Sequence, residues 1–142
     1  MPISQLHEGR TYPATAALRV TRERIIQFAA ALGDADNPAY GGQHPVAPPT
    51  FAVVLSSVAW GAMFDDPDLE LSLSRTVHVD QKFVWRRPLR EGDEVSAVLT
   101  IERVRPRGAT AIVSIAVELT TAAGEHVCTA TSTLMHTAQE TA

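Results

Sequence analysis

A proline- and glycine-containing loop in the first third of the chain carries several side chains that can move a proton or hold a polar ligand. Asp34, Asp36 and Asn37 supply carboxylates and an amide, and Tyr40 and His44 follow with a phenol and an imidazole. A histidine with an ordinary pKa near ~6.5 can take up a proton at neutral pH, and a neighbouring carboxylate can orient it. His44 with Asp34 or Asp36 is therefore a candidate catalytic group. A solvated histidine in a surface loop is the alternative.

The other side chains in this loop also have a structural interpretation. Aspartate and asparagine bond to nearby backbone groups, so Asp34, Asp36 and Asn37 suit the turn that follows a helix. A second pair, His78 and Asp80, stands two residues apart and suits an acid–base pair on one strand face. A polar sheet face explains that pair better. Residue types alone leave these alternatives open.

Composition limits the classes of protein to which the chain can belong. Its 142 residues and 15.3 kDa predict one domain, and 45% hydrophobic with 20% charged residues is ordinary for a globular fold. The net charge is −4, from 12 Lys+Arg against 16 Asp+Glu, so no overall positive field attracts nucleic acid or an anionic membrane. We therefore expect neither a nucleic-acid partner nor a membrane partner.

Cysteine and histidine usage narrows the classes further. Cys128 is the only cysteine, which excludes an intramolecular disulfide and a cysteine-rich zinc site. The five histidines lack metal-ligand spacing and there is no glycine-rich phosphate loop, so we expect no metal and no cofactor. The N-terminus lacks the basic and apolar regions of a signal peptide, and the apolar stretch near residues 51–64 is interrupted by Ser56, Ser57 and Gly61. These features predict a cytoplasmic protein.

Two helices and a shaped loop would position the polar side chains. Thr21 suits an N-cap, apolar residues follow it at helical spacing, and Gly33 suits the end, which predicts a helix over residues 22–32. Residues 34–50 predict a loop that is neither helix nor interior strand, because prolines and glycines recur in it. A second helix is predicted from Phe51, directly after two prolines.

The second predicted helix is apolar on most of its circumference. Phe51, Val54, Leu55 and Val58 belong to one apolar set, and further apolar residues fill the other sides. We expect such a helix to be buried by other elements almost all round.

Alternating apolar residues predict the strands. Their expected ranges are residues 10–20, 76–85, 95–101, 111–119 and 126–136, with turns at residues 88–93, 106–108 and 122–125. Short turns make neighbouring strands antiparallel. The prediction is an α+β hot-dog fold, an antiparallel sheet of about five strands curled around a central buried helix. A meander packed on an exposed helix is the alternative.

Three segments of the chain resemble, in order, those of the MaoC-like hot-dog hydratases. They read GDADNPAY at residues 33–40, VAPPTF at residues 46–51 and VHVDQKFVWRRPLREGD at residues 77–93. The resemblance covers nearly the whole chain and looks strongest to the actinobacterial (3R)-hydroxyacyl-thioester dehydratase subunits of fatty-acid elongation. It implies a single MaoC-like hot-dog domain over residues 1–142 that acts on an acyl-CoA or acyl-carrier-protein thioester.

The chain departs from that family's catalytic pattern at three places. Complete members carry Gly-Asp-x-Asn-Pro-x-His, whereas Tyr40 stands here at the histidine position, and a phenol with a pKa near ~10 is a poor base at neutral pH. At the helix start they carry His-Gly, where this chain has Pro48 and Pro49, and proline has no N–H for the thioester oxyanion. The segment of residues 41–45 is also shorter than is usual in the family. The resemblance therefore implies a subunit that holds substrate and lacks the catalytic histidine.

From this resemblance we expect a (3R)-hydroxyacyl-CoA or acyl-carrier-protein dehydratase (enoyl-thioester hydratase) subunit, a lyase of fatty-acid or related acyl metabolism. The catalytic candidates are Asp34, Asp36 and His44, of which one aspartate matches the family's Asp. The substrate-binding candidates are Asn37, Tyr40, Pro48, Pro49 and Thr50.

Arginines are the candidates for contact with the carrier of the acyl group. The phosphate of a pantetheine arm, or an acidic carrier-protein helix, would meet Arg86, Arg87 and Arg90, or Arg103, Arg105 and Arg107 on a later strand. Solvated hairpin charge is the alternative. We expect a homodimer, or a heterodimer with a catalytic MaoC-like paralogue. The alternative functions are a non-enzymatic acyl-thioester-binding or assembly module, and a hot-dog thioesterase in which Asp34 or Asp36 activates water.

Overall fold

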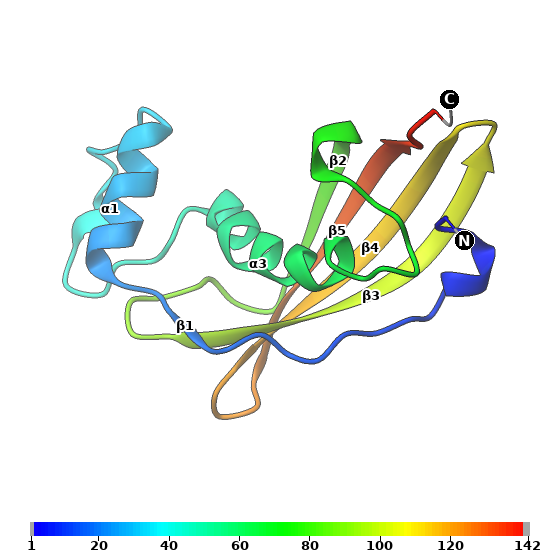
Figure 1. Cartoon of the computed structure of the whole chain (residues 1–142). Helices are drawn as coiled ribbons and strands as arrows, with labels where there is room; N and C mark the ends of the chain where they lie inside the picture. Colours follow the sequence, from blue (N-terminus) through cyan, green and yellow to red (C-terminus); the bar gives the residue numbers. More distant parts are fainter. Residues whose placement is uncertain (1, 141–142) are drawn as a thin grey trace.

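The computed structural model describes residues 2–140, in which five antiparallel strands form one curled sheet (Figure 1). The strands are β1 (Leu18–Arg19), β2 (Thr76–Trp85), β3 (Glu94–Arg107), β4 (Thr110–Thr121) and β5 (His126–Thr137). Their order across the sheet is β1-β3-β4-β5-β2, so β1 and β2 form its two edges. Helix α3 (Ala52–Phe64) lies in the curl of the sheet (Figure 1). The predicted α+β hot-dog fold is confirmed.

Strands β3, β4 and β5 are longer than their alternation predicted. β3 continues past Ile101 to Arg107, because a bulge between Ile101 and Arg103 resets the alternation while pairing with β4 goes on. Pro106, predicted to begin the turn, is therefore the last residue but one of β3. The turn itself uses Gly108, whose φ of 62° is left-handed and suits glycine.

The first predicted strand is mostly irregular. Of residues 10–20, only Leu18–Arg19 form a strand, although Thr11 also makes a single bridge to Thr100. The backbone still runs beside β3, since Tyr12 N–H donates to Leu99 O at 3.0 Å. Pro13 has no N–H for a ladder, which explains why regular pairing is interrupted here.

The helical predictions before the sheet are confirmed in one place and corrected in another. Helix α1 (Arg22–Ala31) begins at Thr21, whose side chain accepts the Arg24 N–H at 3.2 Å, and ends near Gly33 with a φ of 76°. The loop that follows was predicted to hold no helix, but it contains the one-turn helix α2 (Pro38–Gly41). Asn37 caps this turn and proline fixes the backbone angle at its first position, so the residues that exclude a long helix favour a short one.

Helix α3 buries one side and leaves the other open. Ala52, Leu55 and Ala59 face the sheet and are at most 4% exposed, whereas Val58 is 49% exposed. The prediction that this helix is covered almost all round is therefore wrong for the described chain, because a five-stranded sheet curls around only part of it. Val54 lies at the flank and is partly buried.

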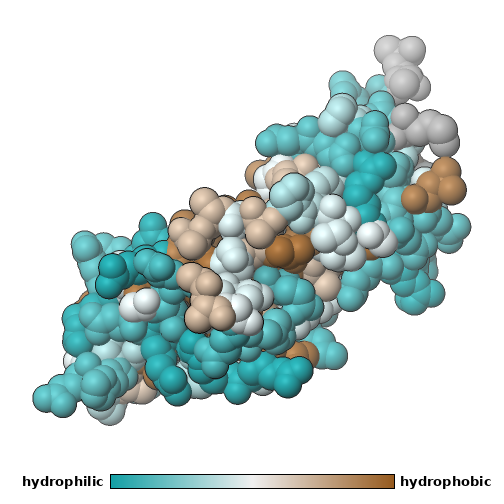
Figure 2. All heavy atoms as spheres, turned by 90° about the horizontal axis from the view of Figure 1, so that it is seen from below, coloured by the Kyte–Doolittle hydropathy of each residue, from teal (hydrophilic) through white to brown (hydrophobic). Residues whose placement is uncertain are grey.

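The molecule is drawn out along the sheet. Helix α1 and the loop after it lie at one end, and the β3–β4 turn and both termini of the described chain lie toward the other (Figure 1). On the face seen from below, apolar and neutral residues occupy the middle of the molecule while hydrophilic residues gather toward both ends (Figure 2). Within residues 2–140, no helix is long and apolar enough to cross a membrane.

Leu55 provides a test of the α3 contact. Because its side chain is 1% exposed and faces the sheet, Leu55→Asp places a carboxylate in the core without a partner, and we expect a loss of several kcal/mol, roughly 3 or more, in the free energy of unfolding. Ser57→Asp, on the exposed side of the same helix, is the matched control and should melt within a few degrees of the parent. Urea denaturation of both variants measures the difference, and equal stabilities would contradict the orientation of α3.

Candidate functional site

A pocket of about 360 Å³ lies where the chain enters α3. Its walls come from the helix entrance and from the end of β2 with the turn after it, and the lining residues are Ala47, Pro49, Trp85, Arg86, Arg87 and Pro88. The helix entrance is tied to the turn after β2, since Ala47 N–H donates to Leu89 O at 2.8 Å, and the end of β2 is held to β5, since Arg86 N–H donates to Val127 O at 2.8 Å. The pocket therefore combines apolar walls with the exposed guanidinium of Arg86 at its rim.

The helix entrance beside this pocket has few backbone donors. The 3-10 turn η2 (Pro49–Phe51) leads directly into α3, and Phe51 N–H donates to Pro48 O at 2.9 Å. Pro48 and Pro49 supply no N–H, so Thr50 carries the first backbone N–H after them. A negatively charged oxygen developing at this turn would therefore be stabilised poorly by the backbone.

One of the two loop carboxylates, that of Asp34, helps to shape the loop through Asn37. Asn37 Nδ2 donates to Asp34 Oδ2 at 3.1 Å, and Asn37 Oδ1 accepts the Ala39 N–H at 3.0 Å, which begins α2. Asp36 and His44 are exposed. Among residues 2–140, no hydrogen bond or ion pair joins His44 to either aspartate, so the structure brings Asp34 and Asn37 together and leaves His44 apart from them.

Tyr40 takes a different position from its polar neighbours. Its ring is partly buried and packs against the hydrophobic core, and its N–H donates to Asn37 O at 3.1 Å within α2. Tyr40 therefore contributes to core packing as well as carrying a phenol hydroxyl.

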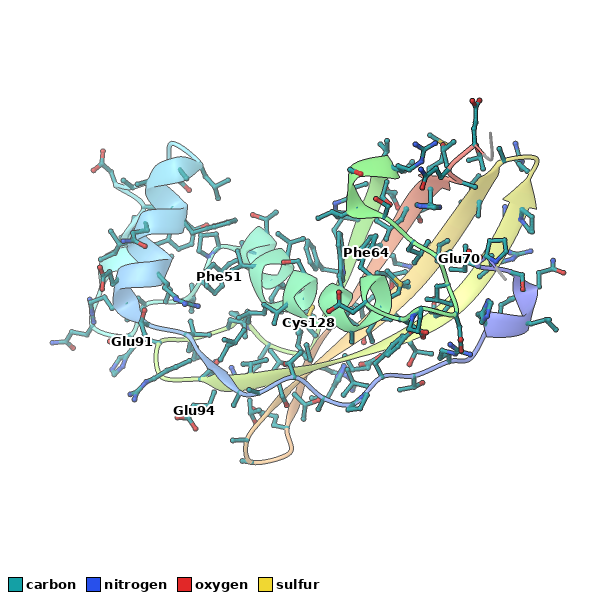
Figure 3. The ribbon with its side chains drawn as sticks, viewed as in Figure 1. Phe51, Phe64, Glu70, Glu91, Glu94 and Cys128 are labelled. Carbon is teal, nitrogen blue, oxygen red and sulfur yellow. The ribbon has the colours of Figure 1, made fainter. Side chains whose placement is uncertain are left out.

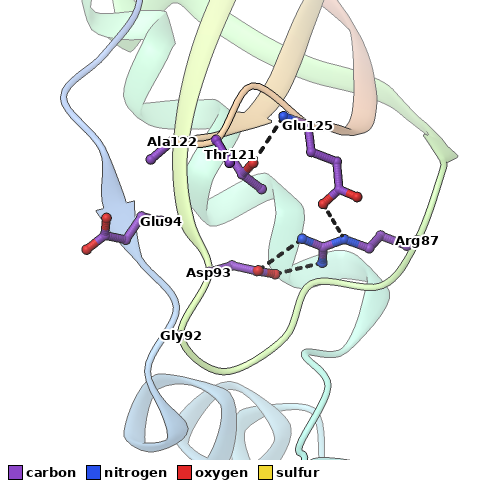
Figure 4. Close-up of a pocket in the computed structure, with 8 residues that line it drawn as sticks. Arg87, Gly92, Asp93, Glu94, Thr121, Ala122 and Glu125 are labelled. Carbon is purple, nitrogen blue, oxygen red and sulfur yellow. Dashed lines mark hydrogen bonds and ion pairs between the residues drawn. The ribbon is translucent and has the colours of Figure 1, made fainter.

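Arg87 holds the turn after β2 in place. Its Nη1 and Nη2 donate to the two carboxylate oxygens of Asp93 at 2.8 and 3.0 Å, and its Nε donates to Glu125 at 2.8 Å (Figure 4). These carboxylates raise the pKa of Arg87. Burial alone would raise the pKa of Asp93, but hydrogen bonds from Arg87 and the Arg90 N–H outweigh it and lower the pKa. Of the three arginines predicted to contact phosphate, Arg87 is thus committed to carboxylates of its own chain.

The ion pairs of Arg87 line a second, more open pocket of about 330 Å³ (Figure 4). Asp93, Glu94 and Glu125 border it, and Thr121 Oγ1 accepts the Glu125 N–H at 3.1 Å. A surface with three carboxylates around one paired guanidinium offers nothing to an anionic ligand. This pairing could not be predicted from the sequence, because Asp93 and Glu125 lie in separate turns.

His78 and Asp80 do not form an acid–base pair. A bulge between them places His78 opposite Leu134, which faces the core, and Asp80 opposite Thr133, which faces the other way. His78 Nε2 instead lies 3.1 Å from Gln81 Oε1. Strict alternation would put His78 and Asp80 on one face, so the bulge removes the basis of the acid–base alternative, which the sequence favours less than a polar sheet face.

Cys128 is a buried thiol on β5, beneath α3 (Figure 3). Burial raises its pKa to about 11, so the reactive thiolate form is scarce at neutral pH. Residues 2–140 contain no group of three or more histidine, cysteine, aspartate or glutamate side chains placed to hold a metal ion.

The curled five-stranded sheet with α3 in its curl is a hot-dog fold. The family model described as FAS1-like, dehydratase domain region matches residues 7–130, and the chain belongs to that family. It is 56% identical over 140 residues to the UPF0336 protein PPA1896 of Cutibacterium acnes, covering 99% of this chain and 98% of that protein.

Solved structures agree with the family. A chain of the C-terminally truncated HadBC (3R-hydroxyacyl-ACP dehydratase) complex of Mycobacterium tuberculosis is 31% identical with a TM-score of 0.78, covering 91% of this chain and 96% of that one. The unliganded R-hydratase PhaJ1 of Pseudomonas aeruginosa shares the fold, with a TM-score of 0.70 at 20% identity over 95% of this chain and 87% of that one. The chain is therefore a MaoC-like hot-dog protein.

The Asp93 carboxylate makes the stability of this turn depend on pH. Because the folded state lowers the pKa of Asp93, its ionised form contributes stability that is fully present above the unfolded pKa near ~3.9 and is lost as the pH falls through the lower folded value. We expect Asp93→Asn to cost about 2 kcal/mol at neutral pH, since Arg87 loses a paired acceptor, and to reduce the loss of stability on acidification.

Denaturant titrations between pH 2.5 and pH 7, spanning the ordinary aspartate pKa near ~3.9, measure this dependence. Asp65→Asn, at an exposed position whose side chain makes no hydrogen bond or ion pair within residues 2–140, is the control and should follow the parent curve. A parent-like acid dependence in Asp93→Asn would contradict the structural role of the Arg87 ion pair.

Proposed function

We propose that the chain is the substrate-holding subunit of a (3R)-hydroxyacyl-CoA or acyl-carrier-protein dehydratase, acting in the cytoplasm with a partner that supplies the catalytic base. One observation carries the proposal: a complete hot-dog fold with a pocket at the α3 entrance has Tyr40 and Pro48–Pro49 where catalysis needs a base and an oxyanion donor. The chain keeps the means to bind a thioester and lacks the means to move its proton.

The pocket residues suit an acyl thioester. The walls formed by Ala47, Pro49 and Trp85 would accept the apolar part near the thioester, and the exposed Arg86 would meet a pantetheine phosphate. Arg90 is also exposed and would be a second cation for the phosphate. Arg87 is instead paired with Asp93 and Glu125. Asn37, Tyr40 and Thr50 remain candidate contacts, because the loop that holds them leads into this entrance.

Chemistry argues against a self-sufficient site. A phenol cannot replace an imidazole as a base near neutral pH, and loss of one oxyanion donor typically lowers a rate by ~10²–10³-fold. His44 and the two aspartates are the remaining candidates for proton transfer, and among residues 2–140 no hydrogen bond or ion pair joins His44 to either aspartate. Support for a partner comes from the similar HadBC protein, which is described as a complex.

The sheet edge supports the same assembly. β2 is an edge strand with no neighbour on one side among residues 2–140, and it carries exposed apolar residues at Val77, Val79 and Val84. Exposed strand edges pair readily with another strand. We propose that β2 pairs with the same strand of a second copy or of a catalytic MaoC-like paralogue, and that this second hot-dog also covers part of α3.

Purified protein incubated with crotonyl-CoA tests the proposed function. We expect binding without appreciable hydration by the chain alone, and hydration when a hot-dog paralogue that carries the Asp and His is added. Tyr40→His alone should help little, because Pro49 still withholds the oxyanion donor. Tyr40→His with Pro49→Gly should exceed the sum of the single effects, since base and donor act on one transition state.

Each other outcome has a defined meaning. Robust hydration by the parent alone, abolished by His44→Ala, would overturn the proposal and make His44 the base. Release of free CoA would indicate a thioesterase, and binding without turnover in the presence of every catalytic paralogue would indicate a binding or assembly module. Asp65→Asn, at the other end of α3 from the pocket, is the control for the binding, hydration and CoA-release measurements.

The solution mass tests the assembly. Light scattering at micromolar concentration should give about twice the mass of one chain, because the β2 edge is paired in a dimer. Val79→Lys on that edge should shift the mass toward the monomer, while Leu6→Lys, at an exposed residue outside β2, should not. A monomeric parent, alone and with a catalytic paralogue, would contradict the proposed pairing.

A further inference from the structure

Arg22, the first residue of α1, reaches across to the loop that follows α2. Its Nη1 donates to Gly42 O at 2.9 Å and lies 3.4 Å from Gly41 O, and its Nη2 lies 3.5 Å from Gln43 O. The same Nη2 donates to Glu91 Oε2 at 3.1 Å. One guanidinium therefore joins three consecutive loop carbonyls to the turn that follows β2.

This loop has little else to hold it. Gly41 and Gly42 have no side chains, and Gln43 and His44 are exposed and make no side-chain hydrogen bond within the described part of the chain. The backbone anchors lie at the end of the loop, where Val46 N–H donates to Ala39 O at 3.0 Å and Glu91 N–H donates to Pro45 O at 3.2 Å. Between these anchors and α2, Arg22 is the side chain that restrains the backbone.

The loop of residues 41–45 connects Tyr40 to the pocket at the entrance of α3. It begins directly after Tyr40, contains His44, and continues into Ala47 and Pro49, which line the pocket at the helix entrance. The conformation of this loop therefore helps to set the positions of Ala47 and Pro49 in the pocket wall. Two glycines in succession would otherwise allow many conformations, because glycine restricts the backbone least.

We propose that Arg22 is a positioning residue that fixes the loop of residues 41–45 and through it the entrance of the binding pocket. The role in the fold stands on the contacts alone, and the role in acyl-thioester binding rests on the proposed function. The ion pair with Glu91 is a minor part of this role, because Arg22 and Glu91 have 41% and 39% of their side chains exposed and such pairs contribute little. The contacts of the Arg22 guanidinium with the carbonyls of Gly41, Gly42 and Gln43 account for most of its positioning role.

Four variants separate the carbonyl contacts from the ion pair. Arg22→Gln removes both, and Arg22→Lys keeps the charge but replaces the planar fork by a single ammonium that cannot serve the loop and Glu91 together. Glu91→Gln removes the ion pair and keeps the carbonyl acceptors. Arg24→Gln, at an exposed residue on the same helix, is the control.

Amide hydrogen exchange measured by NMR provides the first readout. In Arg22→Gln and Arg22→Lys we expect the Val46 and Glu91 amides to exchange about tenfold faster, because local opening needs less free energy without the clamp. Glu91→Gln should stay within about twofold of the parent, and Arg24→Gln should not change. The melting temperatures should differ by only a few degrees, which separates local release from unfolding. Parent-like exchange in Arg22→Gln, or full rescue by Arg22→Lys, would overturn the assignment.

Affinity for crotonyl-CoA, measured by calorimetry, provides the second readout. Arg22→Gln and Arg22→Lys should both bind several-fold more weakly, roughly 3- to 10-fold, while Arg24→Gln binds as the parent does. Faster exchange with unchanged affinity would overturn the role of Arg22 in binding and keep its role in the loop. A parent that does not bind crotonyl-CoA at all would count against the proposed function, and the exchange rates would still decide whether Arg22 holds the loop.

Discussion

The packing of one apolar helix against a curled sheet is the contact on which the rest of this structure depends. Helix α3 turns small residues such as Ala52 and Ala59 toward the sheet, which lets its backbone approach closely. The sheet contributes fully buried side chains to the core, such as Leu99, Ile101 and Val117. Burial of apolar surface at this contact stabilises the folded state by about 25 cal/mol per Å² removed from water. Because it fixes α3, it also fixes the helix entrance and the pocket beside it.

The turn between β2 and β3 transmits that fixed geometry to the loops. Arg87 binds Asp93 within the turn and Glu125 in the neighbouring hairpin, so the turn is held to the sheet. The same turn is also bonded to the chain that enters α3, because Ala47 N–H donates to Leu89 O. Arg22 of α1 contacts both Glu91 in this turn and the loop of residues 41–45. Arg87 and Arg22 therefore hold parts of the backbone in place. Fewer positive charges remain exposed for an anionic ligand than the number of arginines in the sequence suggests.

Much of the fold could be predicted from the sequence, because its signals are local. The N-cap at Thr21, the end of α1 near Gly33 and the alternation along β2 and β4 all describe the backbone directly. Long-range facts could not be predicted in the same way. Bulges shift the alternation without a sequence mark, which hid the opposite orientations of His78 and Asp80. The pairing of Arg87 with Glu125 could not be predicted, because it joins two turns that are far apart in the sequence. The exposed side of α3 could not be predicted either, because it depends on how far the sheet curls around the helix.

The exposed edge of β2 has a consequence for the cell that makes this chain. A strand with an unpaired backbone and apolar residues at Val77 and Val79 can join any other exposed strand, including the wrong one. Copies that remain uncovered are open to aggregation, chaperone capture and proteolysis. If a partner chain covers this edge, as proposed, synthesis of the two chains in matched amounts would leave few copies exposed to these losses.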